Sequence, residues 1–344
     1  MTSKLTRRAA LFFLAVALAI GVAACGGGGS GGGSGEVAKG EIPAKPEAGV
    51  IKMGIEPWIG YGPWYIAEQK GFFKKQGLDV EIVNFSTDAD REAAFVGGKT
   101  DVTNVPTQTT LLFGQQGVPA KAVLLEDESL EADAVLAKAP LTSIKDLKGQ
   151  KVAYEEGTTS DILINYALEQ NGMTISDISK VPMAASNAGN AAMAGQVGAA
   201  VTYQPYIAAV LDKDPEFKEI YAAKEDPGLI SDNLVASNDM IENKPGQVAA
   251  LVRAWGEAIE FYEQNEKEAQ EIITKADGAE PGSLDTSFQG VKLYNLAENK
   301  ELLPGDFVTK TAVDVSKAAN NAGILEEEVE PSSVTEPAFV EAAK

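Results

Sequence analysis

The sequence predicts an α/β protein built from two strand–helix units, and three observations lead to this fold class. Short apolar segments alternate with amphipathic segments in two blocks, one beginning at Val50 and the other after Pro140. Of the 344 residues, 44% are hydrophobic and 23% are charged, which provides enough apolar material for a sizeable core. Glycine or proline marks many junctions between the segments. Two such units that face each other form a cleft at the carboxyl ends of their strands.

The first block predicts alternating strands and helices as far as Leu125. Apolar and acidic residues alternate over Leu78–Asn84, which is the period-two pattern of a half-buried strand. Pro63 opens the first helix and Gly71 follows its end, as helix termini prefer. Strands are expected at Val50–Ile55, Leu78–Asn84, Asp101–Val105 and Ala120–Leu125, and helices at Pro63–Lys70, Ala89–Val96 and Thr107–Gln116.

The second block repeats the alternation, and a helical region follows it. Strands are expected at Lys151–Tyr154, Ser179–Met183, Ala199–Tyr203, Glu219–Ala222 and Leu234–Ser237. Helices are expected at Ser160–Gln170, Ala188–Ala194, Pro205–Leu211, Pro245–Asn265, Glu266–Ala276, Ser283–Asn295 and Gly305–Asn321. Mainly parallel sheets follow from this alternation.

Composition excludes several classes of function. Acidic residues outnumber basic ones by 50 to 29, so the net charge of −21 argues against binding to nucleic acid. The absence of histidine excludes Ser-His-Asp and Cys-His catalysis and any metal site that needs imidazole. No Walker-type or dinucleotide-type glycine loop is present. We therefore expect no enzyme, no cofactor and no metal, and we interpret acidic pairs such as Glu155-Glu156 as solvated surface.

The N-terminus has the layout of a secretory signal. Basic residues at positions 4, 7 and 8 precede the apolar run 9–24. The segment Val22–Cys25 resembles the bacterial lipobox, so residues 1–24 are expected to be a signal peptide and Cys25 to be acylated. Residues 25–49 then form a flexible Gly/Ser-rich linker. A transmembrane anchor is the alternative, and the export route, Sec or twin-arginine, stays open.

Several junctions between strands and helices carry residues suited to ligand binding. Trp58 and Tyr61 lie on a loop rich in Gly and Pro, where they either line a pocket or plug the core. Thr107 follows the third strand, where it either caps a helix or meets an anion at the helix N-terminus. The same alternatives hold for a later junction, where one of Thr158, Thr159 and Ser160 is expected to contact the ligand. Two more junctions lie at Ser186-Asn187 and at Tyr203-Gln204-Pro205.

Four runs of the chain together resemble one family. They are Tyr65–Glu81 (YIAEQKGFFKKQGLDVE), Ala93–Val102 (AAFVGGKTDV), Ile144–Ala153 (IKDLKGQKVA) and Val201–Tyr206 (VTYQPY). The resemblance is to the substrate-binding proteins of ABC importers, in the nitrate/sulfonate/taurine group related to binders of thiamine-pyrimidine precursors. It covers residues 50–265.

The resemblance implies a two-lobed periplasmic-binding-protein-like fold of type II, with two Rossmann-like lobes joined by two hinge strands. Lobe I is expected to contain residues 50–128 and 234–344, and lobe II residues 129–233. The protein would act outside the cytoplasm, held to the cell membrane by lipid on Cys25, and would deliver a small molecule to an ABC permease and its ATPase. The implied pocket residues are Trp58, Tyr61, Thr107, Gln108, Asp127, Ser129, Gly157, Thr158, Thr159, Ser160, Asn187, Tyr203 and Gln204.

Departures from the family pattern leave the ligand open. The family often has Glu where this chain has Gln204, and an amine-bearing ligand such as taurine would lose a counter-charge there. Acidic residues near the hinge, Asp127, Glu128 and Asp133, could replace it. With no obvious Arg or His in the pocket, an anion would rely on helix N-termini, hydroxyls and amides. A sulfonate, nitrate or taurine-like ligand is the main expectation, and a pyrimidine or amine is the alternative.

Two other functions compete with that of an uptake receptor. A ligand sensor lipoprotein on the same fold would bind its ligand without a permease. An enzyme related to the pyrimidine synthases of the family would need the histidine that those enzymes use, and this chain has none.

Overall fold

The computed structural model describes residues 42–285 and 287–343. All of them belong to the compact unit Glu36–Lys344. The expected signal peptide, Cys25 and most of the linker lie outside the described residues. Within residues 42–285 and 287–343, no helix is both long and apolar enough to cross a bilayer.

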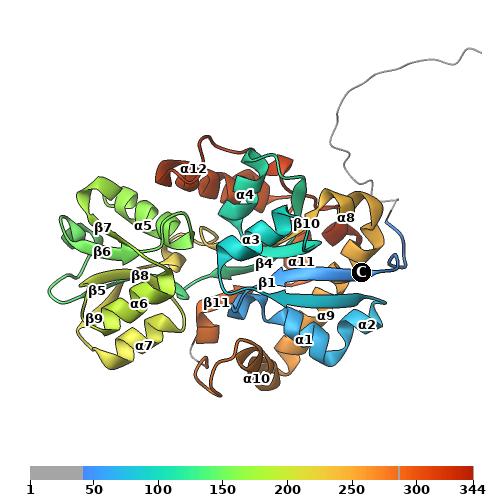
Figure 1. Cartoon of the computed structure of the whole chain (residues 1–344), viewed down its shortest axis with the longest axis horizontal. Helices are drawn as coiled ribbons and strands as arrows, with labels where there is room; N and C mark the ends of the chain where they lie inside the picture. The colour runs from blue at the N-terminus through green and yellow to red at the C-terminus, as the bar shows by residue number, and fades with distance from the viewer. Residues whose placement is uncertain (1–41, 286, 344) are drawn as a thin grey trace, which may run out of the picture. The chain divides into compact units, whose positions relative to one another are not determined.

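The first sheet has six strands in the order β11-β4-β10-β3-β1-β2 (Figure 1). Their bounds are β1 Val50–Ile55, β2 Asp79–Asn84, β3 Val102–Pro106, β4 Ala120–Ser129, β10 Ser231–Ser237 and β11 Val291–Leu293. Strand β1 is parallel to both β2 and β3, whereas β10 runs antiparallel between β3 and β4. The predicted strand Val50–Ile55 is confirmed residue for residue.

The second sheet has five strands in the order β7-β6-β8-β5-β9. Their bounds are β5 Asp133–Lys138, β6 Lys151–Tyr154, β7 Ser179–Pro182, β8 Ala199–Tyr203 and β9 Phe217–Ala222. Strand β6 is parallel to β7 and β8, whereas β5 runs antiparallel to β8 and β9. Each sheet therefore contains one antiparallel strand between two neighbours, β10 in the first and β5 in the second, and the first sheet has a further antiparallel strand, β11, at its edge.

Helices pack on both sheets, and most lie where the sequence predicts them. Around the first sheet are α1 Pro63–Lys70, α2 Phe72–Lys75, α3 Asp88–Val96, α4 Thr107–Gln115, α8 Asn238–Asn243, α9 Pro245–Gln264, α10 Glu266–Ala276, α11 Leu296–Leu302 and α13 Ala338–Ala342. With the second sheet are α5 Thr159–Gln170, α6 Ala185–Met193 and α7 Tyr206–Lys213. Helix α12, Ala312–Ala322, contacts both α4 and α5.

Short helical turns complete the structure. The 3₁₀ turns are η1 Ile59–Tyr61, η2 Ile144–Leu147, η3 Ile175–Asp177, η4 Ala223–Glu225, η5 Ser287–Gly290 and η7 Pro331–Ser333. A π-helical turn, Phe307–Thr311, leads into α12.

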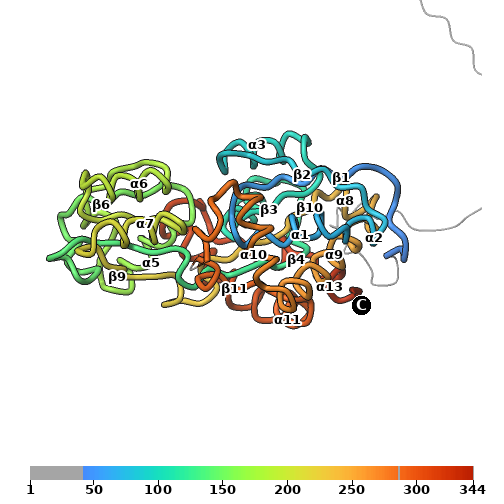
Figure 2. The backbone as a smooth tube through the Cα atoms, turned by 90° about the horizontal axis from the view of Figure 1, so that it is seen from below, coloured from blue at the N-terminus to red at the C-terminus, as the bar shows by residue number. Residues whose placement is uncertain are grey.

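The chain passes between the two sheets at two places (Figure 2). Residues 130–132 connect β4 to β5, and residues 223–230 connect β9 to β10. The carbonyl of Gly290 accepts backbone hydrogen bonds from the amides of Leu130, Glu131 and Ala132 at 2.8 to 3.2 Å. Because a Cβ at position 290 would lie 2.9 Å from the nitrogen of Ala132, only glycine allows this close approach.

Three predictions of secondary structure are wrong. Strand β5 was not expected, because Asp133–Lys138 is short, follows an acidic segment and is buried rather than alternating. The predicted helix Ser283–Asn295 is replaced by η5 and β11, because Val291–Leu293 pairs with the end of β4. A strand was expected to end at Leu125, yet β4 continues to Ser129 through an acidic run that lies buried.

Candidate functional site

The candidate site begins with Trp58, which lies on the turn between β1 and η1. Its indole Nε1–H donates to Asp127 Oδ2 across 3.3 Å. Its ring meets the edge of Tyr203, the last residue of β8, with ring centroids 6.3 Å apart and planes at 77°. Tyr203 in turn contacts Tyr206 in the same edge-to-face manner at 5.4 Å. This aromatic row joins the turn that follows β1 of the first sheet to the end of β8 in the second sheet.

Two carboxyl groups lie next to each other behind Trp58. Asp127 on β4 and Asp232 on β10 are register partners on neighbouring strands, and both are buried. Tyr61 donates its hydroxyl hydrogen to Asp232 Oδ1 at 2.6 Å. Burial raises the pKa of Asp232 to about 6, although the hydrogen bond from Tyr61 opposes the shift. Burial, and next the charge of Asp232, raises the pKa of Asp127 well above its usual value.

The neighbouring strand residue Glu126 faces the core under the first sheet. Trp64 donates its indole Nε1–H to Glu126 Oε1 at 2.6 Å, and burial raises the pKa of this carboxyl well above its usual range. Trp64 packs against Trp255 with ring centroids 4.9 Å apart. Trp64 is therefore a core residue.

A buried guanidinium lies near the predicted site residue Tyr61. Arg91 on α3 is fully buried and forms ion pairs with Glu56 and Asp88. Its charge acts on Tyr61 and on Asp232 as well. Burial disfavours the charged guanidinium, yet the two carboxylates raise the pKa of Arg91 above its usual value, so it stays protonated.

Thr107 and Gln108 begin α4, and the structure uses their side chains differently. The Thr107 hydroxyl donates to the carbonyl of Ser231 at 3.1 Å and accepts from Asn233 Nδ2 at 3.0 Å. It thereby ties the helix N-terminus to β10, while Pro106 occupies the N-cap position. Gln108 is buried, and its Oε1 has no hydrogen-bond partner among the described residues.

Ser129 ends β4 and Asp133 begins β5, on either side of the connection at residues 130–132. Both are buried, and the Ser129 hydroxyl lies beside the Asp133 carboxyl. Burial raises the pKa of Asp133 to about 7, against a smaller opposing effect of Ser129. Asp133 thus adds a further buried carboxyl group at the start of β5.

The junctions of the second block hold their side chains within their own turns. The Gly157 amide donates to Asp161 Oδ2 at 2.9 Å, and Thr158 donates its hydroxyl hydrogen to the carbonyl of Glu155 at 3.1 Å. Thr159 opens α5, and Ser160, which follows it, is buried. The exposed Asn187 is the third residue of α6. The hydrogen bonds of Gly157 and Thr158 thus do not reach the group around Trp58.

Gln204 connects the two sheets from the end of β8. Its backbone amide donates to the carbonyl of Ala132 at 2.8 Å. Its side-chain Oε1 accepts from the Ala208 amide at 3.2 Å and from the Ser287 hydroxyl at 3.3 Å. Gln204 therefore holds the start of α7 and the turn η5 close to the strand connection.

Five members of the site were missed by reasoning from sequence: Glu56, Asp88, Arg91, Tyr206 and Asp232. Tyr206 lies within a run quoted for the family resemblance, and Arg91 is one of only four arginines. These two features were the available signals. Asp232 gave no local signal, because its partner Asp127 is distant along the chain.

Comparison with known proteins identifies the family. The model of the NMT1/THI5-like family matches residues 58–269, which is more than half of the chain. A protein of Brucella abortus (strain 2308) that carries the provisional name of a binding protein is 27% identical over 246 residues, covering 70% of this chain and 76% of its own. A 4-amino-5-hydroxymethyl-2-methylpyrimidine phosphate synthase of Uromyces fabae is 26% identical over 212 residues, covering 56% and 60%.

Solved structures show the same fold. The periplasmic aliphatic sulphonate binding protein SsuA of Escherichia coli superimposes with a TM-score of 0.70 at 16% identity, covering 84% of this chain and 92% of its own. The periplasmic nitrate-binding protein NrtA of Synechocystis PCC 6803 gives a TM-score of 0.60 at 17% identity, covering 86% and 93%.

The chain therefore has the two-lobed fold of the periplasmic binding proteins, as predicted. It belongs to the NMT1/THI5-like family, and the predicted resemblance is confirmed.

Proposed function

We propose that this protein is an extracytoplasmic solute-binding receptor, which captures a small molecule between its two lobes and delivers it to an ABC permease with its ATPase. One observation carries the proposal: Trp58, on the turn that follows β1 of the first sheet, meets Tyr203, the last residue of β8 in the second sheet. Aromatic rings from both sheets beside a buried carboxylate provide apolar area and a polar anchor for one ligand.

The proposed lobes follow the two passages of the chain between the sheets. We assign residues 50–129 and 231–343 to lobe I and residues 133–222 to lobe II, which moves the expected boundaries at 128/129 and 233/234 so that strands β4 and β10 stay whole in the first sheet. The connections at 130–132 and 223–230 provide the hinge. A ligand that binds residues of both lobes favours their closed arrangement, because it contacts both lobes only there.

We propose that the protein is not an enzyme. A synthase occurs among its relatives, but the resemblance implies that such synthases use a histidine, and this chain contains none. Within the described residues, no group of three or more His, Cys, Asp or Glu side chains is arranged to hold a metal ion. A sensor on the same fold is the second candidate, and a permease gene beside the gene for this protein would favour the importer.

The proposed location is the outer face of the cell membrane, reached through a signal peptide (residues 1–24) and lipid on Cys25. The lipobox-like run Val22–Cys25 supports this anchoring. We expect the Cys25→Ser precursor to lose incorporation of labelled palmitate and to leave the membrane fraction. Equal labelling of the variant and the wild type would contradict lipid attachment at Cys25. The same variant binding its solute normally would show that anchoring and capture are separate.

The ligand class is tested by a thermal-shift screen on protein that has been unfolded and refolded to remove carried-over ligand. The panel contains nitrate, taurine, alkanesulfonates, aromatic carboxylates, pyrimidines, amines and polyols. A compound present at about 100 times its Kd stabilises the folded state by roughly 2.7 kcal/mol, which raises Tm by a few degrees. A selective shift by one class supports the receptor function. The absence of any shift, in protein shown to be refolded, counts against it.

A further inference from the structure

We infer that the first lobe contains a second binding site, a cavity beside η1, η5 and β11, which takes a small molecule with an apolar body about the size of a benzene ring and one cationic nitrogen. This site goes beyond the solute capture proposed above. The inference follows from the size of the cavity, from its apolar wall and from the carboxylates at its open side.

The cavity has a volume of about 260 Å³ and is partly open to solvent. A dry apolar cavity of about 150 Å³ is large enough to hold benzene, so this one has room for a ring and a short polar arm. Its described lining comes from η1, the end of α9, the start of α10, η5 and β11. All of these elements belong to lobe I, so the walls of the cavity do not depend on closure of the lobes.

The inner wall of the cavity is apolar. Ile59, Ile259 and Phe288 line it, and all three are buried. Val291 and Leu293 line it from β11, where alternate residues point to the same side of the strand. This wall offers apolar surface for the body of a ligand, and burial of that body is the main source of affinity in such pockets.

The charged groups of the lining are carboxylates. Glu263 and Glu266 are both exposed, so they lie at the open side of the cavity. Glu266 accepts from the side-chain amide of Gln270 at 3.1 Å, whereas Glu263 forms no hydrogen bond or ion pair with any described residue. A cationic group placed here is attracted by two carboxylates, and an anionic group is repelled.

The protein supplies no cation to these carboxylates from the described lining, in which no residue is basic. Lys292 lies between two lining residues of β11, but its ammonium pairs with Glu128 and Glu298 and lies 4.7 Å from the ring centre of Tyr294. Neighbouring residues of a strand face opposite sides, so this lysine points away from the cavity. The counter-charge is therefore left to the ligand.

Aromatic side chains in the lining favour a ring as the apolar body. Tyr262 is half-buried and lines the cavity together with Phe288. The Tyr262 hydroxyl accepts from Gln270 Nε2 at 3.2 Å, and the same amide holds Glu266. One side chain thus fixes both an aromatic ring and a carboxylate of the site before the ligand arrives, which lowers the entropic cost of binding.

The cavity is separate from the aromatic pair Trp58 and Tyr203, neither of which lines it. The two places meet at the turn η1. Ile59 lines the cavity, whereas the indole of Trp58 donates to Asp127. A ligand in the cavity therefore need not touch Trp58, and the interlobe site and the cavity can be filled together.

The test compares three probes that share a ring and a one-carbon arm: benzylammonium, benzyl alcohol and benzoate. Isothermal titration calorimetry on the wild-type protein measures their affinities. We expect benzylammonium to bind at least threefold more tightly than benzyl alcohol and at least tenfold more tightly than benzoate. Raising sodium chloride from about 0.05 M to about 0.5 M should weaken only the binding of benzylammonium, because salt screens exposed carboxylates.

Two variants locate the binding. Glu263→Gln should weaken benzylammonium about threefold and change benzyl alcohol less than twofold. Glu260→Gln is the matched control, because this exposed carboxylate lies on the same helix but does not line the cavity, and it should change neither affinity. Val291→Phe fills part of the cavity and should weaken both probes at least tenfold. Circular dichroism establishes that each variant is folded.

Trp58→Ala distinguishes the cavity from the interlobe site and should leave the affinity for benzylammonium within twofold of the wild type. Benzylammonium binding that Trp58→Ala abolishes and Val291→Phe preserves would assign the probe to the interlobe site and overturn the inference. Benzoate binding as tightly as benzylammonium, or benzylammonium not binding at all, also overturns it. The order of the probes on the wild-type protein decides the matter if Val291→Phe fails to fold. None of these results affects the receptor function, which depends on the residues between the lobes.

Discussion

Some residues of the site form hydrogen bonds within the protein through their polar groups, whereas others have exposed surface or an atom without a hydrogen-bond donor. Tyr61 donates to Asp232, and Thr107 holds α4 on β10. Trp58 and Tyr203 are half-buried, and Asp127 keeps one oxygen without a donor. The half-buried rings of Trp58 and Tyr203 keep exposed surface with which they can contact a ligand.

Trp58 should contribute directly to affinity. We expect Trp58→Ala to weaken binding of the strongest compound in the thermal-shift panel by more than about 1 kcal/mol, since it removes an aromatic contact and its apolar area. Trp58→Phe keeps a ring and should lose less. Isothermal titration calorimetry measures both variants. Affinity unchanged in Trp58→Ala would show that this side chain only supports the loop.

The Asp127–Asp232 pair makes the ligand-free protein sensitive to pH. Both pKa values are raised in the folded protein, that of Asp232 to about 6, so the stability that the pair contributes is present below the unfolded pKa of about 4. It is lost as pH rises through the folded values, because the native state must then hold two adjacent buried carboxylates.

We therefore expect Asp127→Asn to be more stable than the wild type at pH 8, by on the order of 2 kcal/mol. The difference should shrink as the pH falls below the unfolded pKa of about 4, because the wild-type carboxyls are then protonated in both the folded and unfolded states. Thermal melts of both proteins across this pH range measure it. A difference that does not vary with pH would show that the pair is not the cause.

At the scale of elements, β10 links the two halves of the candidate site. It lies between β3 and β4, places Asp232 opposite Asp127, and receives the Thr107 hydroxyl at Ser231. The position of α4 relative to the sheet therefore depends on the Thr107 side chain. From the sequence alone, this side chain was a candidate either to cap the helix or to contact a ligand.

Thr107→Val tests this structural role. The substitution removes the nearer of the two acceptors of the buried Asn233 Nδ2 and leaves only the Thr110 hydroxyl at 3.4 Å, so we expect a loss of roughly 1–3 kcal/mol in the free energy of unfolding. Thr107→Ser keeps the hydroxyl and should stay closer to the wild type. Denaturant titration measures the stabilities. A stable Thr107→Val protein that no longer binds solute would instead place the hydroxyl in contact with the ligand.

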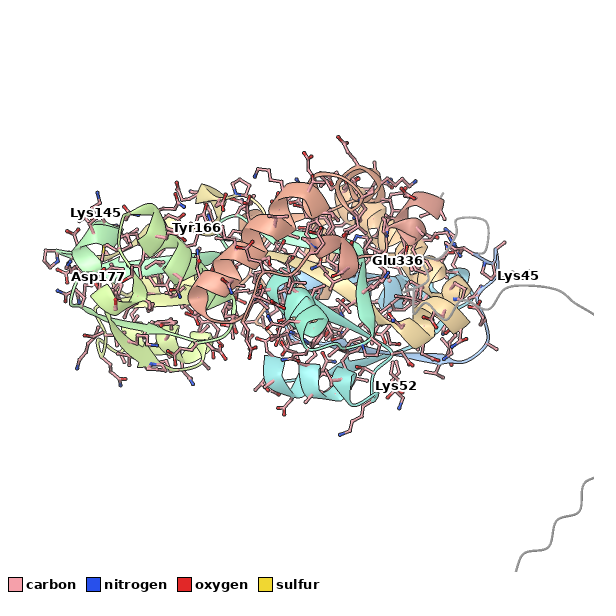
Figure 3. The ribbon with its side chains drawn as sticks, turned by 90° about the horizontal axis from the view of Figure 1, so that it is seen from above. Lys45, Lys52, Lys145, Tyr166, Asp177 and Glu336 are labelled. Atoms are coloured by element: carbon pink, nitrogen blue, oxygen red, sulfur yellow. The ribbon has the colours of Figure 1, made fainter. Side chains whose placement is uncertain are left out.

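At the scale of the whole described unit, α12 contacts α4, which packs with the first sheet, and α5, which packs with the second. Val315 and Ala319 belong to the same hydrophobic cluster as Leu111 of α4 and Ile162 of α5. Figure 3 shows α12 beside α5, the helix that carries Tyr166. Closure around a ligand must preserve this shared packing, because apolar area exposed there would cost free energy. The motion is therefore expected to pivot near the two strand connections.

We expect closure to be visible in solution. Small-angle X-ray scattering should give a smaller radius of gyration when the protein is saturated with the strongest compound of the panel, since hinge closure brings the two sheets together. Trp58→Ala measured with the same compound serves as the control for binding at this site. Superimposable scattering curves with and without bound ligand would contradict hinge closure.

The sequence by itself determined the two alternating blocks and most of their elements, because strand alternation, helix caps and glycine stops are local signals. It also singled out Trp58, Asp127 and Tyr203 as candidates. Strand β5 and the β4–β11 pairing were missed, since buried short strands and long-range pairing carry weak local patterns.

Only the tertiary structure decided which candidate site residues contact one another and which form hydrogen bonds within the fold. It placed Asp232 opposite Asp127 and bonded the Thr107 hydroxyl to the carbonyl of Ser231. It also brought Arg91 beside Glu56, near Tyr61. These relations join residues far apart along the chain, and they depend on sheet register and helix packing rather than on neighbouring sequence. The charge of the site is for that reason a property of the folded molecule. Its aromatic loop, in contrast, can be recognised from one short stretch of sequence.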